Sequence, residues 1–259
     1  MKTGFRTAGF AAWGLGPALR AIREIGFDTV ELCLEHPGSR PEMMDETRIG
    51  RVRKMLEELE LGLSSVSYHG DGSPPEEREA RTLRGIDIAA RMGAGVLVIN
   101  TDAKNPALPG QMEATVDRLK RFCEAAEKRG VDLAVEPEPG LVIESSADLQ
   151  AVVGRVGSPR LKMNLDVGHA FITDPDLLQT IRRMGTMIVH THVEDIAGRV
   201  HRHLLPGEGE IDLAAVAAEL RRAGFAGSLT IDLFNPGDQP DVAARAAFEA
   251  LARVLESAP

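Results

Sequence analysis

The chain alternates between two kinds of segment. Short runs of aliphatic and β-branched residues, such as VLVIN and TMIVHTH, are followed by longer segments in which apolar residues recur at helical spacing. This pattern predicts eight strands, over residues 3–11, 29–35, 63–68, 96–100, 131–136, 161–166, 186–192 and 229–233. It predicts helices over residues 17–25, 44–61, 74–93, 111–129, 146–156, 176–184, 213–223 and 241–255.

This order of elements indicates one α/β fold class. Several predicted strands are almost continuously apolar, which is typical of parallel strands covered on both faces. Eight strand–helix units in 259 residues have the number and size of a (β/α)8 TIM barrel. A doubly wound open sheet would usually carry a glycine-rich phosphate loop after its first strand, and this sequence has none there. We therefore expect a single TIM-barrel domain over residues 1–259.

Composition and charge narrow the classes of partner. The formal net charge of −9 disfavours a broad nucleic-acid surface. Cys33 and Cys123 are far apart in the sequence and lack metal-type spacing, so we expect core thiols in a reducing compartment. No stretch reaches the roughly 18 apolar residues of a membrane span. The sequence predicts a soluble, cytoplasmic protein that does not bind membranes and is not expected to bind nucleic acid.

Histidines and carboxylates gather where a TIM barrel places its active site, at the C-terminal ends of the strands. All seven histidines are predicted to lie at or just beyond those ends, and none in a helix. They are His36, His69, His169, His190, His192, His201 and His203. Imidazoles and carboxylates on one face indicate a metal site or an acid–base site.

Strand alternation predicts that four of these groups face the barrel axis. They are Glu136, Asp166, His192 and Asp232. Burying three carboxylates without a cation is costly, so we expect a divalent metal among them. Oxygen-rich ligands suit Mn²⁺ or Mg²⁺, with Co²⁺ or Zn²⁺ as further options. Alternatively, Glu136 and Asp232 are hydrogen-bonded residues of the barrel lining with no metal.

The segment LKMNLDVGHA carries two further alternatives. An aspartate at a strand end with a histidine three residues later, across Gly168, can place an oxygen and a nitrogen in one cavity. In the other interpretation, Asp166 only starts a turn and His169 caps the next helix.

Five motifs in this order resemble the xylose isomerase-like TIM-barrel superfamily. This group of sugar phosphate isomerases and epimerases also includes the type IV apurinic endonucleases. The motifs are AVEPEP, LDVGHA, HTHVED, PGEGEID at 206–212 and SLTIDLF. The resemblance implies one divalent ion held by Glu136, Asp166, His192 and the acid of the eighth strand. It also implies a small keto sugar, an enediolate intermediate and Glu136 as the main base.

The eighth strand departs from the family pattern. Asp232 stands where the family usually has glutamate, and its side chain is one methylene shorter. Asp232 remains a candidate metal ligand and second catalytic acid, but proton transfer is sensitive to such displacements. Two-base epimerisation is therefore in doubt, whereas one-base isomerisation or dehydration through the same enediolate is compatible with the pattern. A keto acid or a cyclitol is an alternative substrate to the sugar.

Other residues are candidates for binding the substrate. By resemblance, His169 orients a substrate oxygen. Trp13, at the end of the first strand, either lines the pocket or is a core indole. Arg202 and its neighbour Arg199 either bind a phosphate or carboxylate or face solvent. His69 and His203, with His201, either hydrogen-bond the substrate or order the loops.

Two further hypotheses belong to different functional classes. The related endonucleases hold three zinc ions; His69 and His203 match two of their ligands, while His201 stands where they have aspartate. Such an enzyme would cleave abasic DNA. Alternatively, the chain is a barrel that binds a sugar or a partner without turnover. By resemblance, we also expect a homodimer or a homotetramer.

Overall fold

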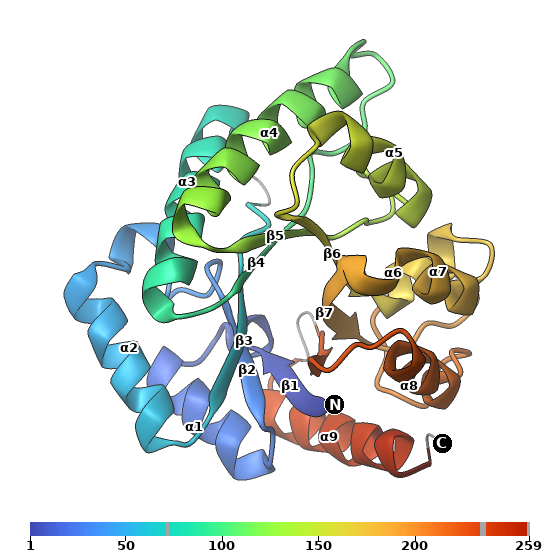
Figure 1. Cartoon of the computed structure of the whole chain (residues 1–259). Helices are drawn as coiled ribbons and strands as arrows, with labels where there is room; N and C mark the ends of the chain where they lie inside the picture. The colour runs from blue at the N-terminus through green and yellow to red at the C-terminus, as the bar shows by residue number, and fades with distance from the viewer. Residues whose placement is uncertain (71–72, 234–236, 258–259) are drawn as a thin grey trace.

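The computed structural model describes residues 1–70, 73–233 and 237–257 (Figure 1). Phe234, the last residue of the SLTIDLF motif, lies outside this part of the chain. The strands pair in parallel in the order β1 to β8, and β8 pairs with β1 to close the barrel. The strands are β1 (Lys2–Arg6), β2 (Thr29–Cys33), β3 (Gly62–Ser67), β4 (Val96–Ile99), β5 (Asp132–Val135), β6 (Leu161–Asp166), β7 (Ile188–Val193) and β8 (Ser228–Ile231).

Helices surround the strands, as Figure 1 shows, and the predicted TIM barrel is confirmed. The α-helices are α1 (Leu15–Ile25), α2 (Glu46–Glu58), α3 (Pro75–Met92), α4 (Gln111–Arg129), α5 (Ser146–Val156), α6 (Val167–Thr173), α7 (Leu177–Met184), α8 (Leu213–Arg222) and α9 (Pro240–Ser257). Three 3-10 turns accompany them: η1 (Thr7–Phe10), η2 (Pro41–Met43) and η3 (Gly185–Met187).

Local sequence signals explain the helix bounds that were predicted correctly. Helix α4 ends at Gly130, and α5 ends at Gly157, both in the left-handed conformation that glycine adopts readily. Ser145 caps α5 in a reciprocal capping box with Asp148, and Asp212 caps α8. The predicted ranges 111–129 and 146–156 are therefore confirmed.

The predicted first strand is too long. Strand β1 ends at Arg6, and the next residues form the turn η1 rather than continuing the strand to residue 11. Phe10 packs from this turn against Phe5, with ring centroids 5.5 Å apart. Core packing therefore favours a turn where apolar content alone predicted a strand.

Helix α6 was not predicted. It begins directly after Asp166, whose carboxylate accepts a hydrogen bond from the backbone N–H of His169 at 2.7 Å. His169 therefore lies inside a helix, and the prediction that no histidine does is wrong. Asp166 is both the N-cap of this helix and a residue of the barrel interior. The interpretation in which His169 caps the helix is wrong, because the cap is Asp166 and His169 lies within the first turn.

The core lies mainly between the strands and the helices. Phe27 packs against Phe5 from β1 and Phe248 from α9, at centroid distances of 5.2 and 5.1 Å. Cys33 and Cys123 are buried and free, which confirms them as core thiols. None of the helices in the described segments combines the length and apolar character needed to cross a bilayer.

Gly168 is required by packing and not by a turn, since its φ is not positive. A Cβ at this position would overlap with Oε1 of Glu194, which accepts a hydrogen bond from the backbone N–H of Gly168 at 2.8 Å.

We predict that Gly168→Ala lowers the free energy of unfolding by about 2 kcal/mol, measured by urea denaturation. Gly154→Ala, in the exposed part of α5 with open space around it, should instead stabilise by about 0.5–1 kcal/mol. Equal effects of the two variants would contradict this account.

Candidate active site

One cavity lies at the C-terminal ends of the strands, with a volume of about 670 Å³. This is within the range of roughly 300–1,000 Å³ for small-molecule sites. Its walls are mainly polar and charged. They are formed by Arg6, Ala8, Glu35, His69, Asn100, Glu136, Glu138, His169, His201, Arg202, His203 and Asp232.

The four residues predicted to face the barrel axis converge at the base of this cavity. Glu136, Asp166, His192 and Asp232 each offer one ligand atom, and these atoms lie within 4.8 Å of one another. Each residue is at most 2 % exposed. Within the described part of the chain, Oδ2 of Asp166 and Oδ1 of Asp232 are buried without a hydrogen-bond partner. Unpaired, buried oxygens of this kind suit coordination of a divalent cation.

Burial and neighbouring acids favour protonation of two carboxyls in the metal-free state. Burial first, and then the charges of Glu194 and Glu136, raise the pKa of Asp166 well above its usual range. Burial likewise raises the pKa of Glu194 to about 8, against a lowering by hydrogen bonding to Asp166. A bound cation would reverse this preference by favouring the ionised forms.

Glu31, from β2, orients the imidazole of His192. Its Oε2 lies 3.0 Å from Nε2 of His192 and 2.9 Å from Nε2 of His190. Nδ1 of His192 then faces Glu136, at 3.1 Å from Oε2. A carboxylate behind a histidine is the usual support of a metal-ligating imidazole. Burial alone would lower the pKa of His192, but the charges of Glu31 and Glu136 raise it well above its ordinary value.

Arg6, the last residue of β1, supplies a positive charge that was not predicted. Its Nε donates to Oε1 of Glu31 at 2.7 Å, and one terminal nitrogen donates to Oδ2 of Asp232. The carboxylates are therefore partly compensated within the protein. Arg6 was missed because the first strand was predicted to end at residue 11, so Arg6 was not recognised as an inward-facing residue at the strand end. Glu31 was missed because it lies within β2 and not at its C-terminal end.

His69 connects Arg6 to Glu136. Its Nδ1 lies 3.1 Å from a terminal nitrogen of Arg6, and its Nε2 lies 3.1 Å from Oε2 of Glu136. Burial lowers the pKa of His69, but Glu136 raises it to about 9, which favours a charged ring. Arg6 can only donate, so Nδ1 must accept at this distance; we therefore assign a neutral ring that donates from Nε2 to Glu136.

Three imidazoles form a second group above the first. Nε2 of His169 lies 2.9 Å from Nε2 of His201, which lies 3.4 Å from Nε2 of His203. Burial is the main cause that lowers the pKa of His169 to about 3. These nitrogens form another group that could hold a metal ion. His169, His69 and His203 all line the cavity; that they contact a substrate stays a prediction.

The structure places one of the remaining substrate-binding candidates at the cavity and two elsewhere. Arg202 lines the cavity, whereas Arg199 donates to the carbonyl of Ile172 and lies over the ring of Phe171. Trp13 is not brought to the cavity. Its indole packs against Phe10 at a centroid distance of 5.2 Å and lines a separate groove between α1 and α9, because η1 turns the chain away from the barrel mouth.

Asp195 organises the loop that carries His201, Arg202 and His203. Its carboxylate accepts the backbone N–H groups of Gly207 at 2.9 Å and Ile211 at 3.0 Å. A Cβ at Gly209 would overlap with the same carboxylate. The PGEGEID motif therefore folds around Asp195 and fixes the wall of the cavity above β7.

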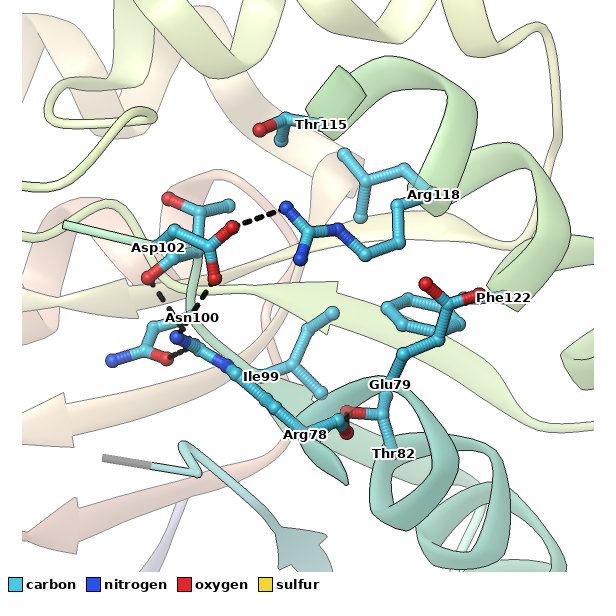
Figure 2. Close-up of a pocket in the computed structure, with 11 residues that line it drawn as sticks. Arg78, Glu79, Thr82, Ile99, Asn100, Asp102, Thr115, Arg118 and Phe122 are labelled. Carbon is cyan, nitrogen blue, oxygen red and sulfur yellow. Dashed lines mark hydrogen bonds and ion pairs between the residues drawn. The ribbon is translucent and has the colours of Figure 1, made fainter. Parts of the chain in front are cut away.

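A smaller pocket lies beside β4, and its polar side chains adjoin the wall of the main cavity (Figure 2). Arg78 of α3 and Arg118 of α4 both pair with Asp102, and Arg78 also donates to Asn100. Nδ2 of Asn100 in turn donates to Oε2 of Glu138 at 2.9 Å. The pocket has a volume of only about 20 Å³, room for roughly one water. Its polar network is linked to the wall of the main cavity through Asn100 and Glu138.

A parallel barrel with a carboxylate–histidine cluster at its C-terminal mouth defines a class of small-molecule enzymes. The model of the xylose isomerase-like TIM barrel family matches residues 19–255, so the chain belongs to that family.

Named relatives and a solved structure agree with this assignment. A fructoselysine 3-epimerase from Shigella flexneri is 25% identical over 272 residues, covering 98% of each chain. An L-ribulose 3-epimerase from Mesorhizobium japonicum is 28% identical, covering 84% of this chain and 74% of its own. The IOLI protein, whose crystal structure holds a zinc atom, superposes with a TM-score of 0.84 at 18% identity, over 100% of this chain and 99% of its own. The curated relatives indicate a sugar isomerase or epimerase family.

We predict that Glu31→Gln weakens binding of Mn²⁺ by about 10- to 100-fold, measured by isothermal titration calorimetry. The neutral amide no longer accepts strongly from Nε2 of His192, so that ring loses its orientation. Glu57→Gln, on the exposed face of α2, is the matched control and should bind as the native protein does. Unchanged affinity in Glu31→Gln would contradict the assignment of His192.

Proposed function

We propose that the protein is a divalent-metal-dependent isomerase or epimerase of small keto sugars that acts through an enediolate. The observation that carries this proposal is the convergence of Glu136, Asp166, His192 and Asp232 within 4.8 Å beneath a polar cavity. We propose these four as the metal ligands. Mn²⁺ or Mg²⁺ fits the oxygen-rich set best, and Co²⁺ or Zn²⁺ are alternatives.

A divalent ion held there would polarise the substrate carbonyl and stabilise negative charge on its oxygen. The residues of the chain perform the proton transfer. Glu136 removes a proton from the carbon next to the carbonyl, the electron pair of that C–H bond forms the carbon–carbon double bond of the enediolate, and the π pair of the carbonyl moves to its oxygen. Glu136 is oriented for this by Nδ2 of Asn164 at 2.9 Å and Nε2 of His69 at 3.1 Å.

The remaining wall residues bind the substrate in this proposal. His169, with a lowered pKa, is neutral and can accept or donate a hydrogen bond to a substrate hydroxyl. His203 and Arg202 lie on the loop above β7, so both can contact the distal part of a sugar. A dehydratase that passes through the same enediolate is the related alternative, because it needs the same base and ligands.

Four finer features stay predictions: the absence of nucleic acid and of membrane among the partners, the oligomeric state and the location. We expect no nucleic acid and no membrane among the partners, consistent with the net charge of −9. A homodimer or homotetramer and a cytoplasmic location follow from the resemblance and the composition alone.

We predict that Glu136→Gln slows solvent deuterium exchange at the carbon next to the carbonyl by at least about 1,000-fold, measured by proton NMR with D-fructose, D-tagatose and L-ribulose. An amide cannot accept the substrate proton. Glu144→Gln is the matched control, because Glu144 lies on the same loop but pairs with Lys104 at the surface. Exchange that persists in Glu136→Gln would rule out Glu136 as the base.

A second candidate function rests on the three imidazoles of His169, His201 and His203. These could hold a further zinc ion, as in a multi-zinc phosphodiesterase acting on abasic DNA. The short distances between their nitrogens, 2.9 and 3.4 Å, favour this hypothesis. Arg6 compensates part of the carboxylate charge in the cavity, and the net charge of the chain is negative. Both observations favour the sugar enzyme over the phosphodiesterase.

We predict that zinc-loaded protein does not incise a duplex containing an abasic site, measured by denaturing gel electrophoresis. The acidic chain offers little attraction for phosphates. His201→Ala combined with His203→Ala removes two of the three imidazoles and serves as the comparison. Incision by the native protein that disappears in this double variant would instead establish the phosphodiesterase function.

A further inference from the structure

Asp232 is held by Arg6 on the floor of the cavity. One terminal nitrogen of Arg6 donates to Oδ2 of Asp232, and Nε donates to Glu31 at 2.7 Å. The other terminal nitrogen reaches His69 at 3.1 Å. Arg6 is 6 % exposed and its guanidinium has three partners, so its position is fixed by the barrel.

The two oxygens of Asp232 have different surroundings. Oδ2 accepts from Arg6, and Oδ1 is buried with no hydrogen-bond partner among the described residues. Asp232 offers one oxygen to the cluster with Glu136, Asp166 and His192, and Oδ2, the oxygen that accepts from Arg6, lies 3.9 Å from Nδ1 of His192. Arg6 therefore holds the Asp232 carboxylate beside the other proposed ligands, whereas Glu136 is oriented at Oε2 by Asn164 and the neutral ring of His69.

We propose that Arg6 is a positioning residue that restrains Asp232 as a metal ligand and thereby makes the enzyme a one-base catalyst. This inference rests on the proposed enediolate function and goes beyond it, because it names the class of reaction. Proton abstraction and return occur on one face of the substrate, at Glu136. The class is aldose–ketose isomerisation rather than inversion of a carbon centre.

The proton balance of this one-base reaction closes without a further reactant. Glu136 takes the proton from the hydroxyl-bearing carbon, and the C–H electron pair forms the enediolate. The protonated Glu136 then returns the proton, from the same face, to the carbon that was the carbonyl, while the hydroxyl proton passes to the former carbonyl oxygen. In two-base inversion, a second carboxylate would protonate the opposite face.

The restraint by Arg6 also explains why position 232 carries aspartate and not the longer glutamate. Arg6 is the last residue of β1 and Asp232 directly follows β8, and β1 pairs with β8 in the closed barrel. A guanidinium at this place fills space and supplies charge beside the carboxylate. Lengthening Asp232 alone should therefore leave it bound to Arg6.

The experiment compares Asp232→Glu alone with Asp232→Glu combined with Arg6→Met. D-fructose, D-tagatose and L-ribulose are incubated in D₂O with Mn²⁺, and NMR measures deuterium and configuration at the carbon next to the carbonyl. In Asp232→Glu we expect exchange with retained configuration only, at a reduced rate. In the double variant we expect the inverted epimer to appear, rising at least tenfold above the level in Asp232→Glu. Asp232→Glu combined instead with Arg6→Lys, which keeps the positive charge, should suppress the epimer again.

Two results would overturn the proposal. One is inversion by the native protein or by Asp232→Glu alone, because Arg6 would then not restrain the second carboxylate. The other is retained configuration in an Asp232→Glu, Arg6→Met double variant that circular dichroism shows to be folded.

A second measurement needs no turnover, so it separates failure of this proposal from failure of the proposed function. The Kd for Mn²⁺ is measured for Arg6→Met in the native background and in the Asp232→Asn background. We expect Arg6→Met to change Kd at least fivefold with Asp232 in place and less than twofold in the Asp232→Asn background. Equal changes in both backgrounds would show that Arg6 does not act through Asp232.

Discussion

The structure depends on the balance of charge inside the barrel. Four acidic side chains, Glu31, Glu136, Asp166 and Asp232, are at most 2 % exposed and lie near one another. Such burial is tolerated only when each charge is paired, protonated or bound to a cation. Arg6 and His192 supply part of the compensation, and the unpaired oxygens of the cluster are suited to a divalent ion for the rest.

The need to compensate these buried charges links distant parts of the fold to the candidate active site. The closed sheet brings β1 beside β8, so a residue near the N-terminus can hold one from the far end of the chain. Gly168 permits the close approach of Glu194 to the start of α6, where Asp166 is the N-cap. Asp195 folds the loop above β7 that carries His203, which lines the same cavity as Glu136 and Asp232. Packing, capping and electrostatics therefore act on the same few residues.

Much of the fold and of the candidate site could be predicted from the sequence because two periodicities are strong. The alternation of apolar strands with amphipathic helices predicted the barrel, and the alternation within strands placed Glu136, Asp166, His192 and Asp232 on one interior surface. What could not be read depends on contacts distant in sequence. Arg6 looked like an ordinary strand residue because its partners, Glu31 and Asp232, lie 25 and 226 positions away. For Trp13 the sequence allows two places, and only the turn η1 decides that it packs on Phe10.

The most direct test of the account is the metal content of protein purified without chelator, measured by elemental analysis. The account predicts about one divalent ion per chain, lost when Asp166 is changed to Asn, because the unpaired buried carboxylate oxygens of the cluster then fall from two to one. Protein that retains no metal after reconstitution with Mn²⁺, Mg²⁺, Co²⁺ or Zn²⁺ would contradict it. Two or three zinc ions per chain would also contradict the single-metal account and would favour the phosphodiesterase.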